Sequence, residues 1–288
     1  MTKNFYEPAT KPTLYFIGVT TSKSSIMKLF PKWADYLKLG DCEIKGFDFK
    51  PHDEPVKYRE CVEFIKNDPL SKGALVTTHK IDLLAACLDQ FDSLDEHAEL
   101  MGEISCISKQ GEKLFGHAKD PISSGLALDH LLPENHWEKT GGEVMAMGAG
   151  GSTIAIMYNL IKQKQNENHP SRIVVTNRSQ PRLDSLKQIL SEIDTNIPTE
   201  FHLCPEPKDN DAVVMNLKPN SLIINATGLG KDMPGSPFTE GVQYPQNSLV
   251  WELNYRGDLI FLDQAEAQKN NGNLTIHDGW VYFIHGWI

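Results

Sequence analysis

The sequence predicts an α/β fold made of two domains. Short apolar segments typical of strands alternate with longer segments of helical periodicity, which indicates βαβ units and a mainly parallel sheet. This alternation runs twice, once on each side of a polar stretch near the middle of the chain. The length of 288 residues also exceeds what one hydrophobic core usually organises.

The first half carries three short apolar segments, which we predict to be strands at 14–19, 44–49 and 73–77. Helical spacing follows each strand: up to Leu37, at 56–67, and from Lys80 onward. Segments 104–109 and 113–118 flank a Gln-Gly turn and predict a β-hairpin.

The second half repeats the pattern after a helix at 121–132 and a polar loop at 133–142. The predicted strands are 144–147, 172–176, 221–226 and 249–253, and the predicted helices are 152–163 and 181–193.

Composition excludes several classes of protein. The net charge of -10 disfavours binding to a phosphate backbone, so no nucleic-acid partner is expected. No apolar run is long enough to span a bilayer, and the polar stretch 1–11 has no apolar signal region, so we expect a cytoplasmic protein. Five scattered cysteines without a CxxC pair predict neither disulfides nor a metal site.

A glycine-rich turn marks the strongest candidate site. Gly148, Ala149, Gly150 and Gly151 lie between the strand at 144–147 and the helix that begins at Ser152. Residues without a Cβ let the backbone approach a pyrophosphate, and the helix amino terminus supplies free N–H groups. The third glycine of the usual fingerprint is replaced by Thr153. The alternative is an ordinary tight turn.

The end of the next strand selects the cofactor. Sites for NAD usually carry an acidic residue there, which binds the ribose 2′-hydroxyl. This chain has Asn177, Arg178 and Ser179, followed by Arg182. Guanidinium groups suit a 2′-phosphate, so the sequence predicts NADP over NAD. The alternative is that both arginines are solvated residues at a helix start.

Taken in chain order, these segments resemble motifs of the shikimate dehydrogenase family over most of the chain. The matching segments are 21–25, 73–77 with Lys80, 101–106, 116–120, 148–151, 177–179 and 225–230, with Tyr255 and Gly279 at the late motifs. The resemblance implies a substrate-binding domain at 1–125, with 270–288 packing back on it, and a Rossmann dinucleotide-binding domain at 126–269.

The resemblance also implies an activity, reversible hydride transfer between NADP and the carbinol carbon of a cyclic hydroxy acid. Lys80 and Asp120 would be the catalytic residues beside the reacting oxygen, since oxidation of C–OH needs a base for its proton. The implied substrate-binding residues are Ser22, Ser24, Thr77, Ser105 and Tyr255. The implied cofactor-binding residues are Gly148, Ala149, Gly150, Gly151, Ser152, Asn177, Arg178, Ser179, Arg182, Thr227, Gly230 and Gly279.

The chain departs from the family pattern in its substrate pocket. The step from Thr77 to Lys80 lacks a proline and is one residue short, and one residue rotates a helical side chain by about 100°. Ser105 and Ala118 replace two asparagines that would bind substrate hydroxyls. An unpaired hydroxyl costs about 1–3 kcal/mol, so we expect a hydroxy acid with fewer ring hydroxyls.

Other interpretations of the same residues stay open. Lys80 could be a surface lysine, Asp120 a helix N-cap, and Ser22 and Ser24 turn hydroxyls. The chain could then be a non-catalytic NADP-binding regulator or sensor, or a reductase of an imine or folate-like ring. A homodimer is an assembly that it could form.

Overall fold

The structure, a computed structural model, describes residues 6–162, 168–193, 195–231 and 233–287. Contacts divide the chain into two compact units, Met1–Lys119 and Asp120–Ile288. Each unit contains one six-stranded sheet, so the predicted two-domain α/β fold is confirmed. The division falls at the start of the helix predicted at 121–132, slightly before the expected boundary at 125.

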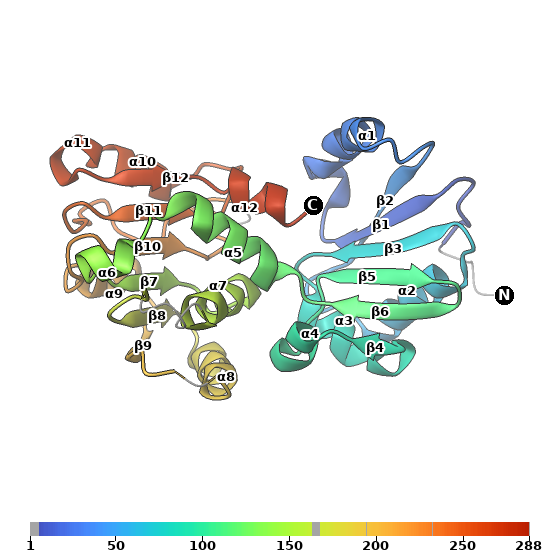
Figure 1. Ribbon diagram of the computed structural model, residues 1–288, viewed down its shortest axis with the longest axis horizontal. Coiled ribbons are helices and arrows are strands. Elements are labelled where there is room, and N and C mark those ends of the chain that lie inside the picture. The colour runs from blue at the N-terminus through green and yellow to red at the C-terminus, as the bar shows by residue number, and fades with distance from the viewer. Residues whose placement is uncertain (1–5, 163–167, 194, 232, 288) are drawn as a thin grey trace. The chain divides into compact units, whose positions relative to one another are not determined.

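The first unit has a mixed sheet in the order β2-β1-β3-β5-β6-β4 (Figure 1). Strand β1 pairs in parallel with β2 and β3, whereas β5 is antiparallel to both β3 and β6. Its core contains Tyr15, Ile17 and Ile107, all fully or almost fully buried. The elements are β1 (Thr13–Gly18), η1 (Thr21–Lys23), α1 (Ile26–Tyr36), β2 (Glu43–Asp48), α2 (Pro55–Asn67), β3 (Ser71–Val76), α3 (Lys80–Cys87), η2 (Leu88–Gln90), β4 (Ser93–Leu94), α4 (Glu96–Met101), β5 (Cys106–Gln110) and β6 (Lys113–His117).

The second unit has a wholly parallel sheet in the order β12-β11-β10-β7-β8-β9. The chain moves outward from β7 to β8 and β9, then returns to place β10 on the other side of β7. The connection after β7 therefore leads to β8 and the connection after β10 leads to β11, in opposite directions along the sheet. Ligands of open α/β sheets bind in the crevice at this switch point. The elements are α5 (Asp120–Leu131), α6 (His136–Thr140), β7 (Val144–Met147), α7 (Gly151–Lys162), β8 (Ile173–Asn177), α8 (Gln180–Ser191), β9 (Thr199–Leu203), α9 (Pro207–Val214), β10 (Leu222–Asn225), β11 (Leu249–Glu252), α10 (Ile260–Glu266), α11 (Lys269–Gly272), β12 (Thr275–His277) and α12 (Trp280–His285).

Helices α12, α5, α7 and α8 form a row in which each contacts the next (Figure 1). Helices α5 and α7 pack closely because Gly125 has no side chain: a Cβ there would lie 2.7 Å from Oδ1 of Asn159. The amide of Asn159 donates to the Pro121 carbonyl and to Oγ of Ser124, the latter over 2.9 Å. The start of α5 is thereby tied to the helix that follows the glycine turn.

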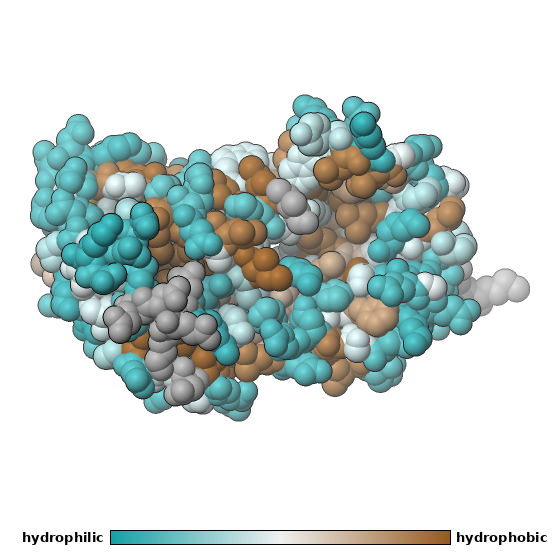
Figure 2. Space-filling model, viewed as in Figure 1, coloured by the Kyte–Doolittle hydropathy of each residue, from teal (hydrophilic) through white to brown (hydrophobic). Residues whose placement is uncertain are grey.

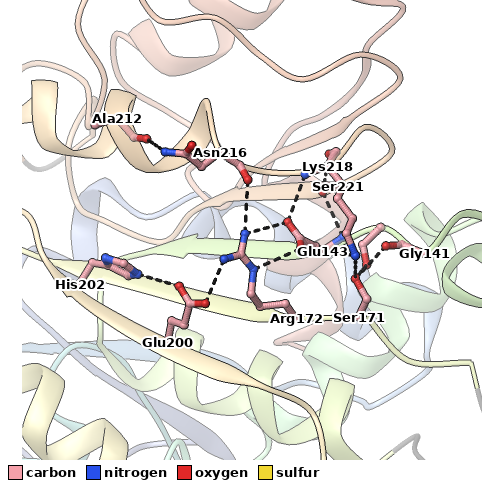
Figure 3. A network of polar contacts seen from close by, with 11 residues as sticks. Gly141, Glu143, Ser171, Arg172, Glu200, His202, Ala212, Asn216, Lys218 and Ser221 are labelled. Atoms are coloured by element: carbon pink, nitrogen blue, oxygen red, sulfur yellow. Dashed lines mark hydrogen bonds and ion pairs between the residues drawn. The ribbon is translucent and has the colours of Figure 1, made fainter.

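A network of charges joins the amino-terminal ends of β7, β8 and β9. The guanidinium of Arg172 donates two hydrogen bonds to Glu143, of 3.1 and 3.0 Å, and one of 2.9 Å to Glu200 (Figure 3). The Glu143 side chain is only 5% exposed and also accepts from the backbone N–H of Lys218 over 3.1 Å. This network stabilises the edge of the sheet opposite the switch point.

Several elements of the second unit, α6 and β9 among them, differ from the sequence-based expectation. The segment 133–142 was predicted to be a loop, and this prediction is wrong because 136–140 forms α6. Its Trp137 is buried although the residues beside it in the sequence are polar, so tertiary packing decided the conformation. Strand β9 was not predicted, since its alternation of Phe201 and Leu203 with polar residues is short. Among the strands that the structure describes, it pairs with β8 alone. Gln163, the predicted end of α7, lies outside the described residues.

Polar side chains cover much of the face shown in Figure 2, as the strongly acidic composition leads one to expect. Within the described ranges, no helix combines the length and apolar character needed to cross a membrane.

Candidate functional site

The turn after β7 brings the backbone close to the neighbouring strand. Gly148 has a φ of +104°, and a Cβ there would lie 2.8 Å from the carbonyl oxygen of Ala226. Gly150, by contrast, has no atom within 4 Å of its Cβ position and faces open space. The hydroxyl of Thr153, the residue that departs from the fingerprint, donates to the Gly148 carbonyl over 2.7 Å and so stabilises the turn.

A cavity of about 630 Å³ opens at this turn, at the carboxyl ends of β7, β8, β9 and β10. Eight of the predicted cofactor residues line it, namely Gly148, Ala149, Gly150, Asn177, Arg178, Ser179, Arg182 and Thr227. Gly151 and Ser152 instead form the first residues of α7. Free N–H groups at that helix start and the open space over Gly150 suit a pyrophosphate.

The turn after β8 supplies positive charge to the cavity. Arg178 and Arg182 both line it and are both exposed. Asn177 braces the turn because its side-chain amide donates to the Ser179 carbonyl over 3.1 Å. The segment 177–182 carries no carboxylate, so a phosphate beside it would meet two guanidinium groups.

The loop after β9 forms a wall of the cavity that the sequence did not reveal. Cys204, Glu206 and Asn210 line the cavity from this side. Burial raises the pKa of the Cys204 thiol to about 11, so this side chain contributes no charge to the cavity at pH 7. The Glu206 carboxylate caps α9 by accepting from the backbone N–H of Asp209. The missed signal was β9 itself, without which the loop could not be placed.

Gly230 and Gly279 lie outside the lining of this cavity, and the backbone explains a glycine at each position. A Cβ at Gly279 would lie 2.2 Å from the Leu253 carbonyl oxygen. Gly230 has a φ of +84°, and its N–H donates to the Met233 carbonyl over 2.7 Å.

Three predicted substrate residues of the first unit, Ser22, Ser24 and Thr77, follow the ends of β1 and β3. Thr21 anchors its turn because its N–H and hydroxyl both donate to Oδ1 of Asp48, over 2.8 and 2.5 Å. Ser22 is thereby held exposed and Ser24 half-buried. The N–H of Thr77 donates to the Ile17 carbonyl over 2.9 Å, so its half-buried side chain follows the same two strands.

The shortened loop before Lys80 closes through an unusual backbone conformation. Thr78 has a φ of 57°, in the left-handed region, and the N–H of His79 donates to the Thr77 carbonyl. The His79 ring is fully buried, and its Nδ1 lies 3.0 Å from the Tyr58 hydroxyl. Burial lowers the pKa of His79, which is therefore neutral at pH 7. Lys80 begins α3 directly after it and is half-buried.

The two positions that replace the family's asparagines present little polar surface. The Ser105 hydroxyl oxygen is buried and accepts from the backbone N–H of Lys119 over 2.8 Å. Ala118 is fully buried, and its N–H donates to Oδ1 of Asp95 over 3.1 Å. The Ser105 hydroxyl thus has a structural partner, and Ala118 offers no side-chain hydrogen bond.

Asp120 and Tyr255 belong to the second unit. Asp120 is the first residue of α5 and is 8% exposed. The Tyr255 ring packs against Phe283 with a centroid distance of 4.2 Å, and Nζ of Lys231 lies 5.9 Å from its centroid. In the part of the chain that the structure describes, no group of three or more His, Cys, Asp or Glu residues is placed to hold a metal ion.

The parallel strand order, the glycine turn and the cavity at the switch point define a dinucleotide-binding domain. The chain therefore belongs to the class of two-domain α/β proteins that carry such a domain. No protein-family model matches it.

Comparison with known proteins narrows this class. A shikimate dehydrogenase (NADP(+)) of Lactococcus lactis is 27% identical over 185 residues, which are 63% of this chain and 61% of that protein. A shikimate dehydrogenase (NADP(+)) of Caldicellulosiruptor saccharolyticus is 27% identical over 217 residues, 74% of this chain and 69% of that protein. The match to the Lactococcus protein thus spans less than two thirds of its length.

A solved shikimate dehydrogenase from Aquifex aeolicus shares the fold, with a TM-score of 0.71 at 19% identity over 98% of this chain and 91% of that chain. The chain is thus similar in sequence to shikimate dehydrogenases and shares the fold of a solved one, as its motifs predicted.

Proposed function

We propose that the chain is an NADP-dependent dehydrogenase that acts on the carbinol carbon of a cyclic hydroxy acid. The observation that carries this proposal is the pair Arg178 and Arg182 at a cavity whose floor is the open glycine turn. The residues fit the cofactor: the space over Gly150 admits a pyrophosphate, and two guanidinium groups suit a 2′-phosphate. Related proteins named as NADP(+) enzymes support the same choice.

The proposed catalytic residues are Lys80 and Asp120. The bound nicotinamide would supply the hydride chemistry. Lys80 would accept the hydroxyl proton as the C–OH carbon is oxidised and would stabilise negative charge on its oxygen. Asp120 would hold the ammonium group and assist the proton transfer.

We propose that Ser22, Ser24, Thr77 and Tyr255 bind the substrate, with hydroxyl donors for its carboxylate. Ser105 would contribute less than an asparagine because its hydroxyl already accepts from Lys119. This supports a substrate with fewer ring hydroxyls than shikimate. A homodimer and a cytoplasmic location stay predictions.

The test is an activity assay with shikimate, quinate and simpler cyclic hydroxy acids as substrates, each with NADP and with NAD. Absorbance of the reduced nicotinamide measures turnover. We expect turnover with NADP and a preference for acids with fewer hydroxyls. Lys80→Met should abolish turnover and leave NADPH binding unchanged, whereas Lys72→Met, at an exposed lysine of β3, should change neither. NADPH binding without turnover of any acid would instead favour the regulator or sensor.

A further inference from the structure

Glu252, the last residue of β11, is a fully buried carboxylate beside the loop that follows β10. Its Oε2 accepts a 2.7 Å hydrogen bond from the side-chain amide of Asn225, and its Oε1 accepts a 2.8 Å bond from the backbone N–H of Asn254. Both carboxylate oxygens thus face N–H donors. The residue does not itself line the cofactor cavity.

The two asparagines that contact Glu252 hold the loop 227–229. Oδ1 of Asn225 accepts from the N–H and the hydroxyl of Thr227, over 3.0 and 2.6 Å. The side-chain amide of Asn254 donates to the carbonyls of Thr227 and Leu229, over 3.3 and 3.1 Å. Thr227 and Leu229 both line the cavity, so the network ends on its wall.

The charge of Glu252 sets the orientation of the Asn225 amide. A carboxylate only accepts, so Asn225 must turn its NH₂ group to Glu252 and its carbonyl to Thr227. A protonated carboxyl would direct an O–H at groups that are themselves donors. Asn225 would then have to turn over and would present its NH₂ group to the N–H of Thr227, which breaks the bond that holds the loop.

The surroundings keep this carboxylate close to protonation. Burial raises the pKa of Glu252 to about 7, although the bonds from Asn254 and Asn225 and the nearby charge of Lys231 lower it. The buried phenol of Tyr244 is a further titratable group beside it, and burial together with the charges of Glu252 and Asp211 raises the pKa of that phenol. Tyr244 therefore stays neutral, and Glu252 is the group that changes charge.

We propose that Glu252 is a positioning residue whose ionised form holds 227–229 in the conformation that binds the dinucleotide, so that affinity falls when Glu252 takes up a proton. This inference rests on the proposed function, because it assigns the cavity to a dinucleotide. Glu252 acts through Asn225 and Asn254 and touches neither cofactor nor substrate.

The test is a titration of the full chain with NADPH between pH 5.5 and 8.5, in which nicotinamide fluorescence reports binding. The wild type should lose about tenfold in affinity on protonation, the effect of one charge-assisted hydrogen bond. Glu252→Gln should bind weakly at every pH. Because the 2′-phosphate also titrates near pH 6, the readout is the difference between the two profiles, and NADH is titrated in parallel.

The double variant Asn225→Asp with Glu252→Gln is the matched control. It exchanges the carboxylate and the amide, so the new amide donates to position 225 and the new carboxylate still accepts from Thr227. We expect its affinity to return close to that of the wild type above pH 7. Parallel profiles for the wild type and Glu252→Gln, or a double variant no better than the single one, would overturn the inference alone. No NADPH binding by the wild type at any pH would overturn the proposed function as well.

Discussion

The carbonyl oxygen of Ala226, just beyond β10, lies close to the Cα of Gly148. A Cβ atom built on Gly148 would be 2.8 Å from this oxygen. The turn after β7 therefore lies directly against the loop after β10. Two residues later, Gly150 has no neighbour within 4 Å of its Cβ position. Gly148 is required by the close approach of the Ala226 carbonyl, whereas Gly150 leaves room for a ligand.

Substituting these two glycines should separate folding from binding. Gly148→Ala should lower the free energy of unfolding by about 1–3 kcal/mol, because alanine is strained at positive φ and its Cβ meets a carbonyl. Gly150→Ala should change stability by less than about 1 kcal/mol, yet weaken NADPH binding about tenfold or more, since its methyl occupies the ligand's space. Urea unfolding and NADPH titration measure the two effects. Equal losses of stability would contradict this assignment.

Removing the guanidinium groups should weaken NADP selectively. Arg178→Ala and Arg182→Ala should each raise the NADPH dissociation constant by about 10–100-fold, the effect of losing a hydrogen bond between charged groups. Affinity for NADH should stay nearly the same, because it has no 2′-phosphate. Lys187→Ala, an exposed cation further along α8, is the control and should affect neither cofactor. A parallel loss for both cofactors would show that the arginines do not contact that phosphate.

The left-handed residue before Lys80 should be a source of strain. Thr78→Gly should raise the free energy of unfolding by up to about 1 kcal/mol, because threonine pays a steric penalty at a φ of 57° that glycine does not. Thr20→Gly is the control: its φ is -145°, so glycine there adds only unfolded-state entropy and should destabilise. Thermal unfolding measures both. Destabilisation by Thr78→Gly would mean that contacts of the threonine side chain outweigh the strain.

The charge network at the opposite edge of the second sheet should affect stability without affecting binding. Arg172→Met should cost about 3 kcal/mol, because the buried Glu143 carboxylate loses both guanidinium hydrogen bonds and keeps only its contacts with Lys218. Adding Glu143→Gln should restore part of this loss. Glu266→Gln removes an exposed ion pair with Lys269 and should cost less than about 0.5 kcal/mol. Urea unfolding tests the series, and equal effects of Arg172→Met and Glu266→Gln would contradict it.

Acid should weaken the fold through its buried histidines. Burial lowers the pKa of His79 and of His136 in the folded protein, so below about pH 6.5 the unfolded chain binds protons that the folded chain does not. Their contribution to stability is therefore lost as the pH falls through this range.

Glu252 acts in the opposite direction, because its raised pKa makes the folded chain bind the extra proton below about pH 7. The measurement is therefore the difference between the wild type and His136→Gln, which can still donate to the Asn220 carbonyl. The variant should lose less stability than the wild type between pH 8 and 5. Identical pH profiles would show that His136 does not contribute.

The sequence predicted those parts of the second unit whose local signals agree with their burial. Strand β7 has the predicted bounds, and the glycine turn and α7 follow it as expected. The strand at 172–176 and the helix at 181–193 were also found, displaced by a residue or two. In all of these the apolar periodicity and the turn residues point to the same structure.

The remainder depended on contacts that no local pattern records. Strand β9 exists because β8 offers it a partner, so the wall of the cavity formed by Cys204 and Asn210 could not be predicted. The short step from Thr77 to Lys80 predicted that the Lys80 side chain is rotated. It did not predict that Thr78 adopts the left-handed conformation that closes this loop. Nothing in the sequence indicated that the Leu253 carbonyl lies so close to Gly279 that a side chain is excluded there. The assignment of Gly279 to the cofactor stays a prediction.

The hydrogen bonds from Asn159 to the start of α5 bear on how the substrate of the proposed site could change in evolution. Hydrogen bonds join α5, which begins at Asp120, to α7, which begins at Gly151. The proposed catalytic carboxylate therefore keeps its position relative to the glycine turn. Lys80 belongs to the other unit. Under the proposed function, substitutions in the first unit would change the choice of substrate, and the place of the Asp120 carboxylate relative to the glycine turn would be retained.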